Sequence, residues 1–219
     1  MLIFGGLLGI PSNGIPYFLF FLAGMTVWAF FEQTLIWTTR SLELNRKLLQ
    51  KVYFPRILLP VASSAPALYQ LGVYFALLAL AIVVISVSDA TMYLQLDLQL
   101  LAAIGAVFLA GALALAIGIW TSVLGANVRD VRYSLLYVLG FWFFVTPVIY
   151  PLSLVPEGYR TVAQVNPMTP IVELFRMSLF DAGQVASWSL AGTVVLIFVV
   201  GVSGLWYFGR AESAAVDRL

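Results

Sequence analysis

The stretch NRKLLQKVYFPR, residues Asn45–Arg56, separates two long apolar segments and carries four of the chain's eleven Lys and Arg residues. A fifth cation, Arg40, precedes it. Only 10% of the 219 residues are charged and 62% are hydrophobic, so a cluster of cations marks a place where the chain meets water. Asn45–Arg56 therefore predicts a loop between membrane spans, on the side of the membrane that holds most of the positive charge.

The composition is that of a polytopic, all-α membrane protein. The mean hydropathy is +1.01, and several apolar runs reach the roughly 20 residues that cross a hydrocarbon core about 30 Å thick. Cysteine and histidine are absent, which excludes disulfides and removes the commonest general base and metal ligand. We therefore expect no catalytic residues, no metal site and no cofactor bound by the chain itself.

Five full spans are expected in one transmembrane domain, residues 1–219. They cover residues 17–39, 66–87, 98–124, 134–150 and 188–208, with an amphipathic entry at 57–65. The apolar residues 2–10 are too few to cross a membrane. They indicate either a frayed start or the end of a truncated first span, and we expect a natural ancestor with six spans and both ends inside.

Residues 151–186 form a different kind of region, in which prolines and charges recur. An Arg or Asp at the centre of a bilayer costs about 2.5–3.5 kcal/mol, so this segment is not expected to cross as one helix. Two short helices, at about 157–164 and 170–180, lying on the membrane or dipping into it, fit the sequence better.

The third span carries a small residue at every fourth position. These residues are Ala102, Ala106, Ala110, Ala114, Gly118 and Ser122. Small side chains at this spacing form a groove that lets another helix approach closely. The alternative is an Ala-rich helix that merely fills space.

The distribution of Lys and Arg predicts the orientation. With five spans, segments 40–56, 126–133 and 209–219 lie on one side and carry five, two and two cations. The other side receives only Arg160 and Arg176. By the positive-inside rule the first three segments are cytoplasmic, and region 151–186 is external.

The sequence contains no energy-converting site of its own. It has neither the G-x-x-x-x-G-K-[ST] phosphate loop nor the G-x-G-x-x-G dinucleotide turn. Glu32 is the only ionisable candidate within a span for ion coupling. It either faces a conduit or hydrogen-bonds to polar neighbours such as Gln33, Thr34 or Thr38. A transporter built this way must take its energy from a partner protein.

Three stretches carry a resemblance to a known family. They are NRKLLQKVYFPRILLP at residues 45–60, NVRDVRY at 127–133, and TPVIYPLSLVPEGYRTVAQVNPMTPIVELFR at 146–176. Together they resemble the permease subunits of ABC-type polysaccharide exporters, which serve O-antigen, teichoic acid and capsule-like glycans within the type-2 ABC exporter family. The resemblance covers roughly residues 10–210. It departs at the front, where family members begin with a cytoplasmic amphipathic helix and a complete first span.

The resemblance implies a homodimer in the plasma membrane, the bacterial inner membrane, with two separate ATPase subunits that bind the ATP. The dimer would export a lipid-linked polysaccharide, and no nucleic acid takes part. The implied ATPase-coupling residues are Asn45, Arg46, Lys47, Lys51, Tyr53, Phe54, Pro55, Arg56, Arg129, Asp130 and Arg132. The implied residues of an external re-entrant gate are Pro151, Pro156, Glu157, Arg160, Asn166, Pro167, Glu173 and Arg176.

Aromatic side chains offer faces on which a sugar chain could stack. The aromatic candidates for lining a conduit are Phe30, Phe31, Phe141, Trp142, Phe143 and Phe144. Glu32 is a further candidate, as an ionisable residue within a span. The alternative is that these aromatic residues face lipid or neighbouring helices, as they commonly do in membrane proteins. For the basic segment 40–56, the alternative to ATPase docking is contact with anionic lipid.

Two other functions remain open from the sequence. One is a type-2 ABC permease that moves a drug or a lipid. The other is a non-transporting membrane scaffold or a truncated relic, which the short first span would fit.

Overall fold

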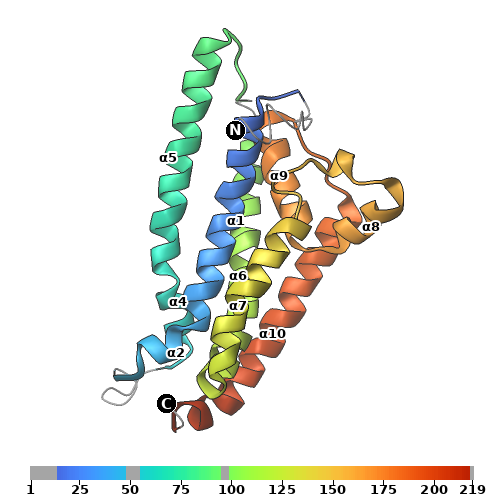
Figure 1. Ribbon diagram of the computed structural model, residues 1–219. Coiled ribbons are helices and arrows are strands. Elements are labelled where there is room, and N and C mark those ends of the chain that lie inside the picture. The colour runs from blue at the N-terminus through green and yellow to red at the C-terminus, as the bar shows by residue number, and fades with distance from the viewer. Residues whose placement is uncertain (1–13, 48–54, 95–98, 218–219) are drawn as a thin grey trace.

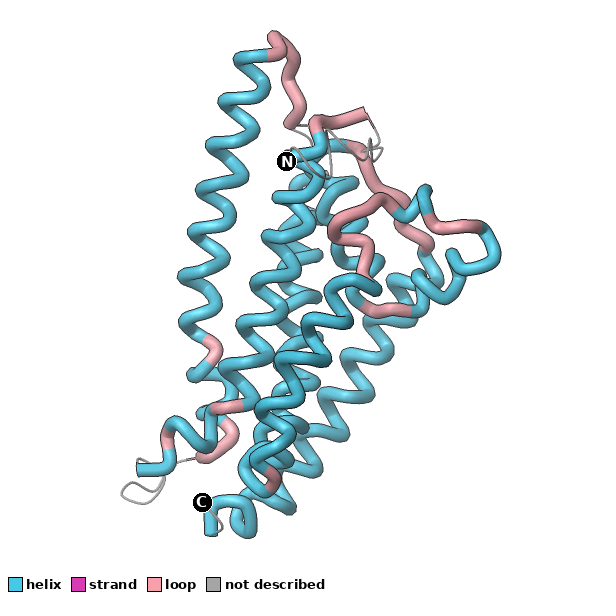
Figure 2. Tube along the Cα trace, viewed as in Figure 1, coloured by secondary structure: helices cyan, strands magenta, loops and turns pink. Residues whose placement is uncertain are grey.

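The computed structural model describes residues 14–47, 55–94 and 99–217, and over these ranges the chain is helical with no strand (Figures 1 and 2). The α-helices are α1 (Tyr17–Thr39), α2 (Ser41–Leu44), α4 (Leu58–Ser63), α5 (Ala65–Ser88), α6 (Leu100–Asn127), α7 (Arg129–Val145), α8 (Glu157–Val165), α9 (Met168–Phe180) and α10 (Ser187–Asp217). A 3-10 turn, η2 (Leu152–Leu154), precedes α8. The interpretation of residues 2–10 falls outside the described ranges.

Among the described residues, four helical stretches are long and apolar enough to cross a membrane. They are Tyr17–Thr39, Leu58–Ser88, Leu100–Asn127 and Ser187–Arg210. This confirms the predicted class, an all-α protein with several candidate membrane spans. The expected fourth span corresponds to α7, whose 17 residues are fewer than the 23 to 31 of the other four stretches.

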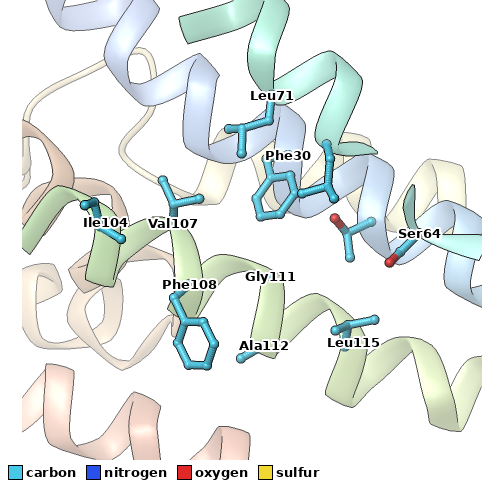
Figure 3. Close-up of a pocket in the computed structure, with 11 residues that line it drawn as sticks. Phe30, Ser64, Leu71, Ile104, Val107, Phe108, Gly111, Ala112 and Leu115 are labelled. Carbon is cyan, nitrogen blue, oxygen red and sulfur yellow. The ribbon is translucent and has the colours of Figure 1, made fainter. Parts of the chain in front are cut away.

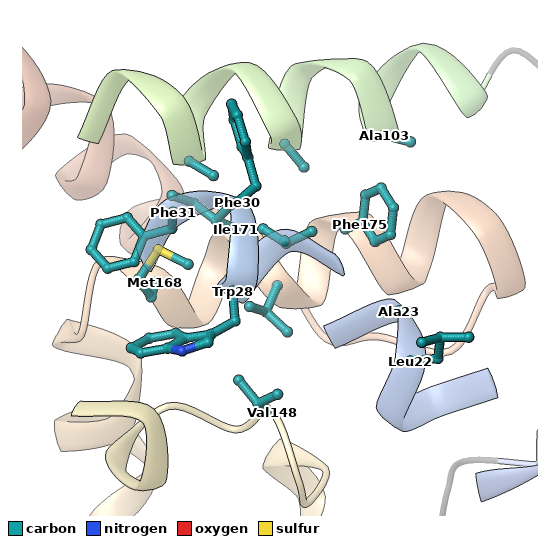
Figure 4. Close-up of a cluster of buried hydrophobic side chains, with 14 of the residues drawn as sticks. Leu22, Ala23, Trp28, Phe30, Phe31, Ala103, Val148, Met168, Ile171 and Phe175 are labelled. Atoms are coloured by element: carbon teal, nitrogen blue, oxygen red, sulfur yellow. The ribbon is translucent and has the colours of Figure 1, made fainter. Parts of the chain in front are cut away.

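Helix α1 is the centre of the bundle. In its most apolar stretch of 18 residues, 72% of the residues are buried. The corresponding share is 17% in Leu58–Ser88 and 17% in Ser187–Arg210. Helix α1 packs against α5, α6 and α9, and the core around it contains Trp28, Phe31, Ile171 and Phe175 (Figure 4). A helix surrounded on most sides is expected to be apolar on most sides, as the sequence of α1 is.

Prolines mark the beginnings of several helices. Pro16, Pro156 and Pro167 stand at the N-caps of α1, α8 and α9, and Pro66 lies in the first turn of α5. Proline is tolerated there because the first backbone N–H groups of a helix have no intrahelical acceptor. These signals are why the expected short helices at 157–164 and 170–180 correspond closely to α8 and α9.

The predicted boundaries differ from the observed ones in several places. Asn127–Tyr133 was expected to be a charged turn, but Asn127 ends α6, Val128 alone is extended, and Arg129 already begins α7. Segment 209–219 was expected to be a polar tail, but α10 continues as a helix to Asp217. The span expected at 134–150 is α7, which begins five residues earlier and ends at Val145, just before Thr146-Pro147.

The small residues of the third span are buried inside the bundle. Ala106, Ala110 and Ala114 are fully buried in α6. A Cβ atom at Gly118 would overlap the side chain of Thr38 in α1. The predicted close helix approach is therefore present, and its partner at Gly118 is α1.

The charged segments sort to the two ends of the bundle. Helices α2 and α4, the α6–α7 junction and the end of α10 lie together at one end, and α8 and α9 lie towards the other (Figure 1). We call these the basic end and the α8–α9 end.

Candidate functional site

The basic end brings together two segments that are far apart in the sequence. Arg132, at the start of α7, places its Nε 3.2 Å from Oε2 of Glu43 in α2. Arg132 also donates a hydrogen bond to the carbonyl oxygen of Gly125 at the end of α6. Nε of Arg40 lies 3.7 Å from the same Glu43 oxygen. Segments 40–56 and 126–133 therefore meet at one ion-paired junction.

The junction surrounds a small hollow of about 100 Å³ lined by Ile36, Arg40, Glu43, Arg132 and Tyr133, among others. Glu43 is the only acid between residues 40 and 56. Sequence reasoning concentrated on cations and did not single it out. The sequence signal that could have identified Glu43 is that it is a single acidic residue within a basic segment.

Asn45 has a structural role within the basic end. Its Nδ2 donates to the carbonyl oxygen of Ser41 at 2.9 Å and to Oγ of Ser63 at 3.1 Å. These bonds tie the residue after α2 to the last residue of α4. They hold the end of α4 against the end of α2.

Other predicted coupling residues point towards water. Arg46, Lys47, Arg129 and Asp130 are exposed, and Arg129 donates a hydrogen bond of 3.1 Å to the hydroxyl of Tyr133. Among the remaining residues of this set, Pro55 is exposed and Arg56 is half-buried. Lys51, Tyr53 and Phe54 lie outside the described residues.

The α8–α9 end is organised around a buried arginine. The side chain of Arg176 in α9 is 0% exposed and that of Glu173, one turn earlier, is 1% exposed, with 3.2 Å between Nη1 and Oε1. Arg176 also donates to the carbonyl oxygens of Pro147 and Val148, each at 2.6 Å, and to that of Phe20 at 3.2 Å. One guanidinium thereby joins α9, α1 and the chain after α7.

The surroundings of Arg176 are shaped for it. Its Cζ lies 3.6 Å from the centroid of the Phe20 ring, a cation–π contact. A Cβ atom at Gly24 would overlap the guanidinium, so α1 has no side chain where the arginine passes. Burial lowers the pKa of Arg176 to about 10, and Glu173 opposes that shift. The guanidinium therefore keeps its charge at neutral pH.

Glu173 extends the same network to the loop that precedes α10. Its second oxygen accepts a 2.9 Å hydrogen bond from the backbone N–H of Gln184, in the loop between α9 and α10. A Cβ atom at Gly183 would overlap the backbone oxygen of Glu173, which is why glycine occurs at this close approach. Burial raises the pKa of the Glu173 carboxyl, and the Arg176 charge acts in the opposite direction.

Asn166 joins α7 to the turn between α8 and α9. Its Oδ1 accepts hydrogen bonds from Trp142 Nε1 at 2.8 Å and from the Met168 backbone N–H at 3.1 Å. Its Nδ2 donates to Thr146 Oγ1 at 2.9 Å. Tyr17 adds a bond from its hydroxyl to the carbonyl oxygen of Ile149 at 2.9 Å.

The predicted gate residues thus divide into two groups. Asn166, Glu173 and Arg176 tie separate elements together, whereas Arg160 donates to the nearby carbonyl oxygens of Ser153 and Val155. Of the others, Pro156 and Glu157 are exposed, Pro151 is buried and Pro167 is half-buried. The carbonyl partners of Arg176 were not foreseen, because no side-chain pattern marks a backbone acceptor.

The conduit-lining candidates divide into side chains packed inside the bundle and side chains exposed on the outer face of α7. Phe31 is fully buried, and its ring centroid lies 5.2 Å from that of Trp142. Phe143 packs edge-on to Trp28, and Phe30 is 8% exposed. Phe141 and Phe144, in contrast, are 72% and 64% exposed on the outer face of α7.

Glu32 is half-buried in α1. Two of the polar neighbours suggested for it do not bond to it. The hydroxyls of Thr34 and Thr38 are buried and make no hydrogen bond in the described structure. The expected pairing of Glu32 with these two threonines is therefore wrong.

No group of three His, Cys, Asp or Glu residues within the described ranges is placed to hold a metal ion. Compared with models of known protein families the chain has no match, and it matches no curated protein sequence.

Proposed function

We propose that this chain is the membrane permease subunit of an ABC-type exporter that carries lipid-linked polysaccharide across the bacterial plasma membrane, with ATP hydrolysed by a separate subunit. The observation that carries this proposal is the ion-paired junction between Glu43 and Arg132. It unites two short segments from opposite halves of the chain into one surface at the basic end.

This surface has the properties of a docking site. Arg46, Lys47 and Arg129 are exposed, so their charges are available to an acidic groove on a partner. The segments behind them are the ends of α1, α6 and α7, which continue through the bundle. A push on this surface would therefore be transmitted along rigid helices to the α8–α9 end.

The proposed topology has five spans in this chain, with α7 as the fourth. Helix α7 begins with the charged residues Arg129–Arg132 of the basic end, so 13 of its residues, 133–145, are available for the crossing. They are about 20 Å long at 1.5 Å per residue, less than a hydrocarbon core of about 30 Å. In this proposal the turn after Val145, whose carbonyl oxygens at Pro147 and Val148 bind Arg176, completes the crossing. This arrangement places the basic end in the cytoplasm and makes α8 and α9 the external re-entrant gate.

The outer face of α7 is the proposed meeting surface of two permease copies. Tyr137, Phe141 and Phe144 lie on it and are 82%, 72% and 64% exposed. Two such faces opposed across a dimer axis would supply aromatic rings on both sides of a conduit. Sugar rings stack on aromatic faces, which makes this face suited to a glycan.

The proposal is tested by charge reversal at the docking surface. Arg46→Glu with Lys47→Glu should reduce co-purification of the ATPase subunit in mild detergent, because exposed cations steer and hold an acidic partner. Arg210→Glu is the matched control, since it reverses an exposed cation of the same end but outside the junction. Equal recovery of the ATPase with all variants would contradict docking at Arg46 and Lys47.

The substrate is tested in cells that lack the protein. Export of a lipid-linked glycan predicts that this intermediate accumulates on the cytoplasmic side and that the wild-type chain reverses the accumulation. Normal glycan export with a changed drug or lipid distribution would instead assign a drug or lipid substrate. No change in either would indicate a non-transporting membrane protein.

A further inference from the structure

An apolar groove runs between α5 and α6, with α1 as its floor. It has a volume of about 430 Å³, within the range of about 300–1,000 Å³ that is usual for small-molecule sites. The walls include Leu68 and Leu71 of α5 and Val107 and Phe108 of α6, and the floor is formed by Phe30 and Thr34 (Figure 3). This groove is separate from the basic end and from the Arg176 network.

The open side of the groove faces the region that a membrane would occupy. Leu68, Ile104 and Phe108 at its edges are 61%, 68% and 72% exposed, and α5 and α6 are two of the helices long and apolar enough to span. In a bilayer these edges contact hydrocarbon. An unfilled groove there would forfeit dispersion contacts along its whole lining.

The groove is graded in polarity along its length. Its two hydroxyl-bearing residues are Ser64, at the break between α4 and α5, and Thr34, one turn past Phe30 towards the basic end. Ile104, Val107 and Leu71 line the part away from Ser64 (Figure 3). Thr34 is 2% exposed, and its hydroxyl has no hydrogen-bond partner in the described structure.

The basic end lies close to the more polar end of the groove. Helix α4 has six residues and connects the half-buried Arg56 region to Ser64, a rise of about 9 Å at 1.5 Å per residue. An anionic headgroup placed beside the cations of the basic end would thus lie near the groove entrance. Basic residues next to a membrane attract anionic lipids in this way.

We propose that this groove binds one acyl chain of an anionic phospholipid from the leaflet at the basic end. The tail would lie along Val107 and Leu71, and the ester region would lie near Thr34 and Ser64. A helix from a second copy, about 10–12 Å across with its side chains, is the alternative occupant, and the experiment distinguishes the two. The inference requires only that the chain spans a membrane and is independent of the proposed transport function.

The experiment uses the full chain in vesicles of phosphatidylcholine and phosphatidylglycerol. The probe is phosphatidylglycerol with a photoactivatable diazirine near the end of one acyl chain. Labelling of the α6 peptide around Val107–Leu115 should exceed labelling of the exposed α10 face around Val194–Val202 several-fold. Uniform labelling of both peptides would overturn the proposal, because it would show lipid contact without a site.

Two groove-filling variants make the result specific. Ala112→Phe on α6 and Leu68→Trp on α5 should each lower the α6 labelling to the level of the α10 face. Ala191→Phe adds the same ring to an exposed position of α10 and should leave the labelling unchanged. Undiminished labelling in both filled variants would contradict the site, and a dimer-to-monomer change without loss of labelling would assign the groove to a second copy.

Discussion

The two ends of this molecule use charge in opposite ways. At the basic end, Arg46, Lys47 and Arg129 are exposed, and the Glu43–Arg132 pair is itself partly exposed. At the α8–α9 end, Glu173 and Arg176 are almost completely buried and bound to one another and to backbone groups. Exposed charge is available to a partner, whereas buried charge holds the chain's own loops in place. The comparison separates a surface for recognition from a network for internal support.

The largest expected effect is the loss of Arg176. Arg176→Gln should destabilise the protein by about 3–5 kcal/mol, because it leaves Glu173 buried without its counter-charge and removes donors from the carbonyl oxygens of Pro147, Val148 and Phe20. Thermal unfolding in detergent measures this. Arg160→Gln, which removes only local bonds, is the control. A melting temperature equal to that of the wild type would show that the buried network does not support the α8–α9 end.

A smaller loss is expected when the space for the guanidinium is closed. Gly24→Ala should cost about 1–3 kcal/mol, the usual penalty of overpacking a buried site, since the new methyl group would overlap Arg176. Gly72→Ala in α5 is the matched control, with nothing within 4 Å of the added Cβ. The same melting assay applies, and equal behaviour of the two variants would argue against tight packing around Arg176.

The junction at the basic end should matter little for stability. Glu43→Gln breaks a partly exposed ion pair and should change the free energy of unfolding by only about 0.2–1 kcal/mol. It should nevertheless weaken recovery of the ATPase subunit, because α2 would no longer be held against the start of α7. A large loss of stability without any loss of recovery would reverse the roles assigned to the two ends.

Much of the helix pattern followed from the sequence, for identifiable reasons. The bounds expected for the first span, 17–39, are those of α1, because Pro16 precedes it and polar residues follow it. Helix α7 ends at Val145 because Pro147 disfavours the helical conformation in the residue before it, Thr146. In these places the local chemistry of one or two residues is sufficient.

The remaining features depend on contacts between distant residues. Arg129-Asp130-Val131-Arg132 looked like a turn because it is charged, but nothing in it prevents a helix, and Asp130 in the first turn favours one. The pairing of Glu43 with Arg132 and the capture of Arg176 by three carbonyl oxygens arise only when α1, α7 and α9 are assembled. Sequence patterns report local preferences, so these parts of both candidate sites were not predictable.

The most direct test of the central claim is site-specific photo-crosslinking in native membranes. A photoreactive amino acid at Lys47, at the basic end, should form an adduct with a protein that carries the G-x-x-x-x-G-K-[ST] phosphate loop of an ATPase. The same amino acid at Tyr159, 69% exposed on α8, should form no such adduct. An ATPase adduct from Lys47 alone is the result that this account predicts. Adducts from Lys47 that contain only lipid, with no ATPase, would contradict it.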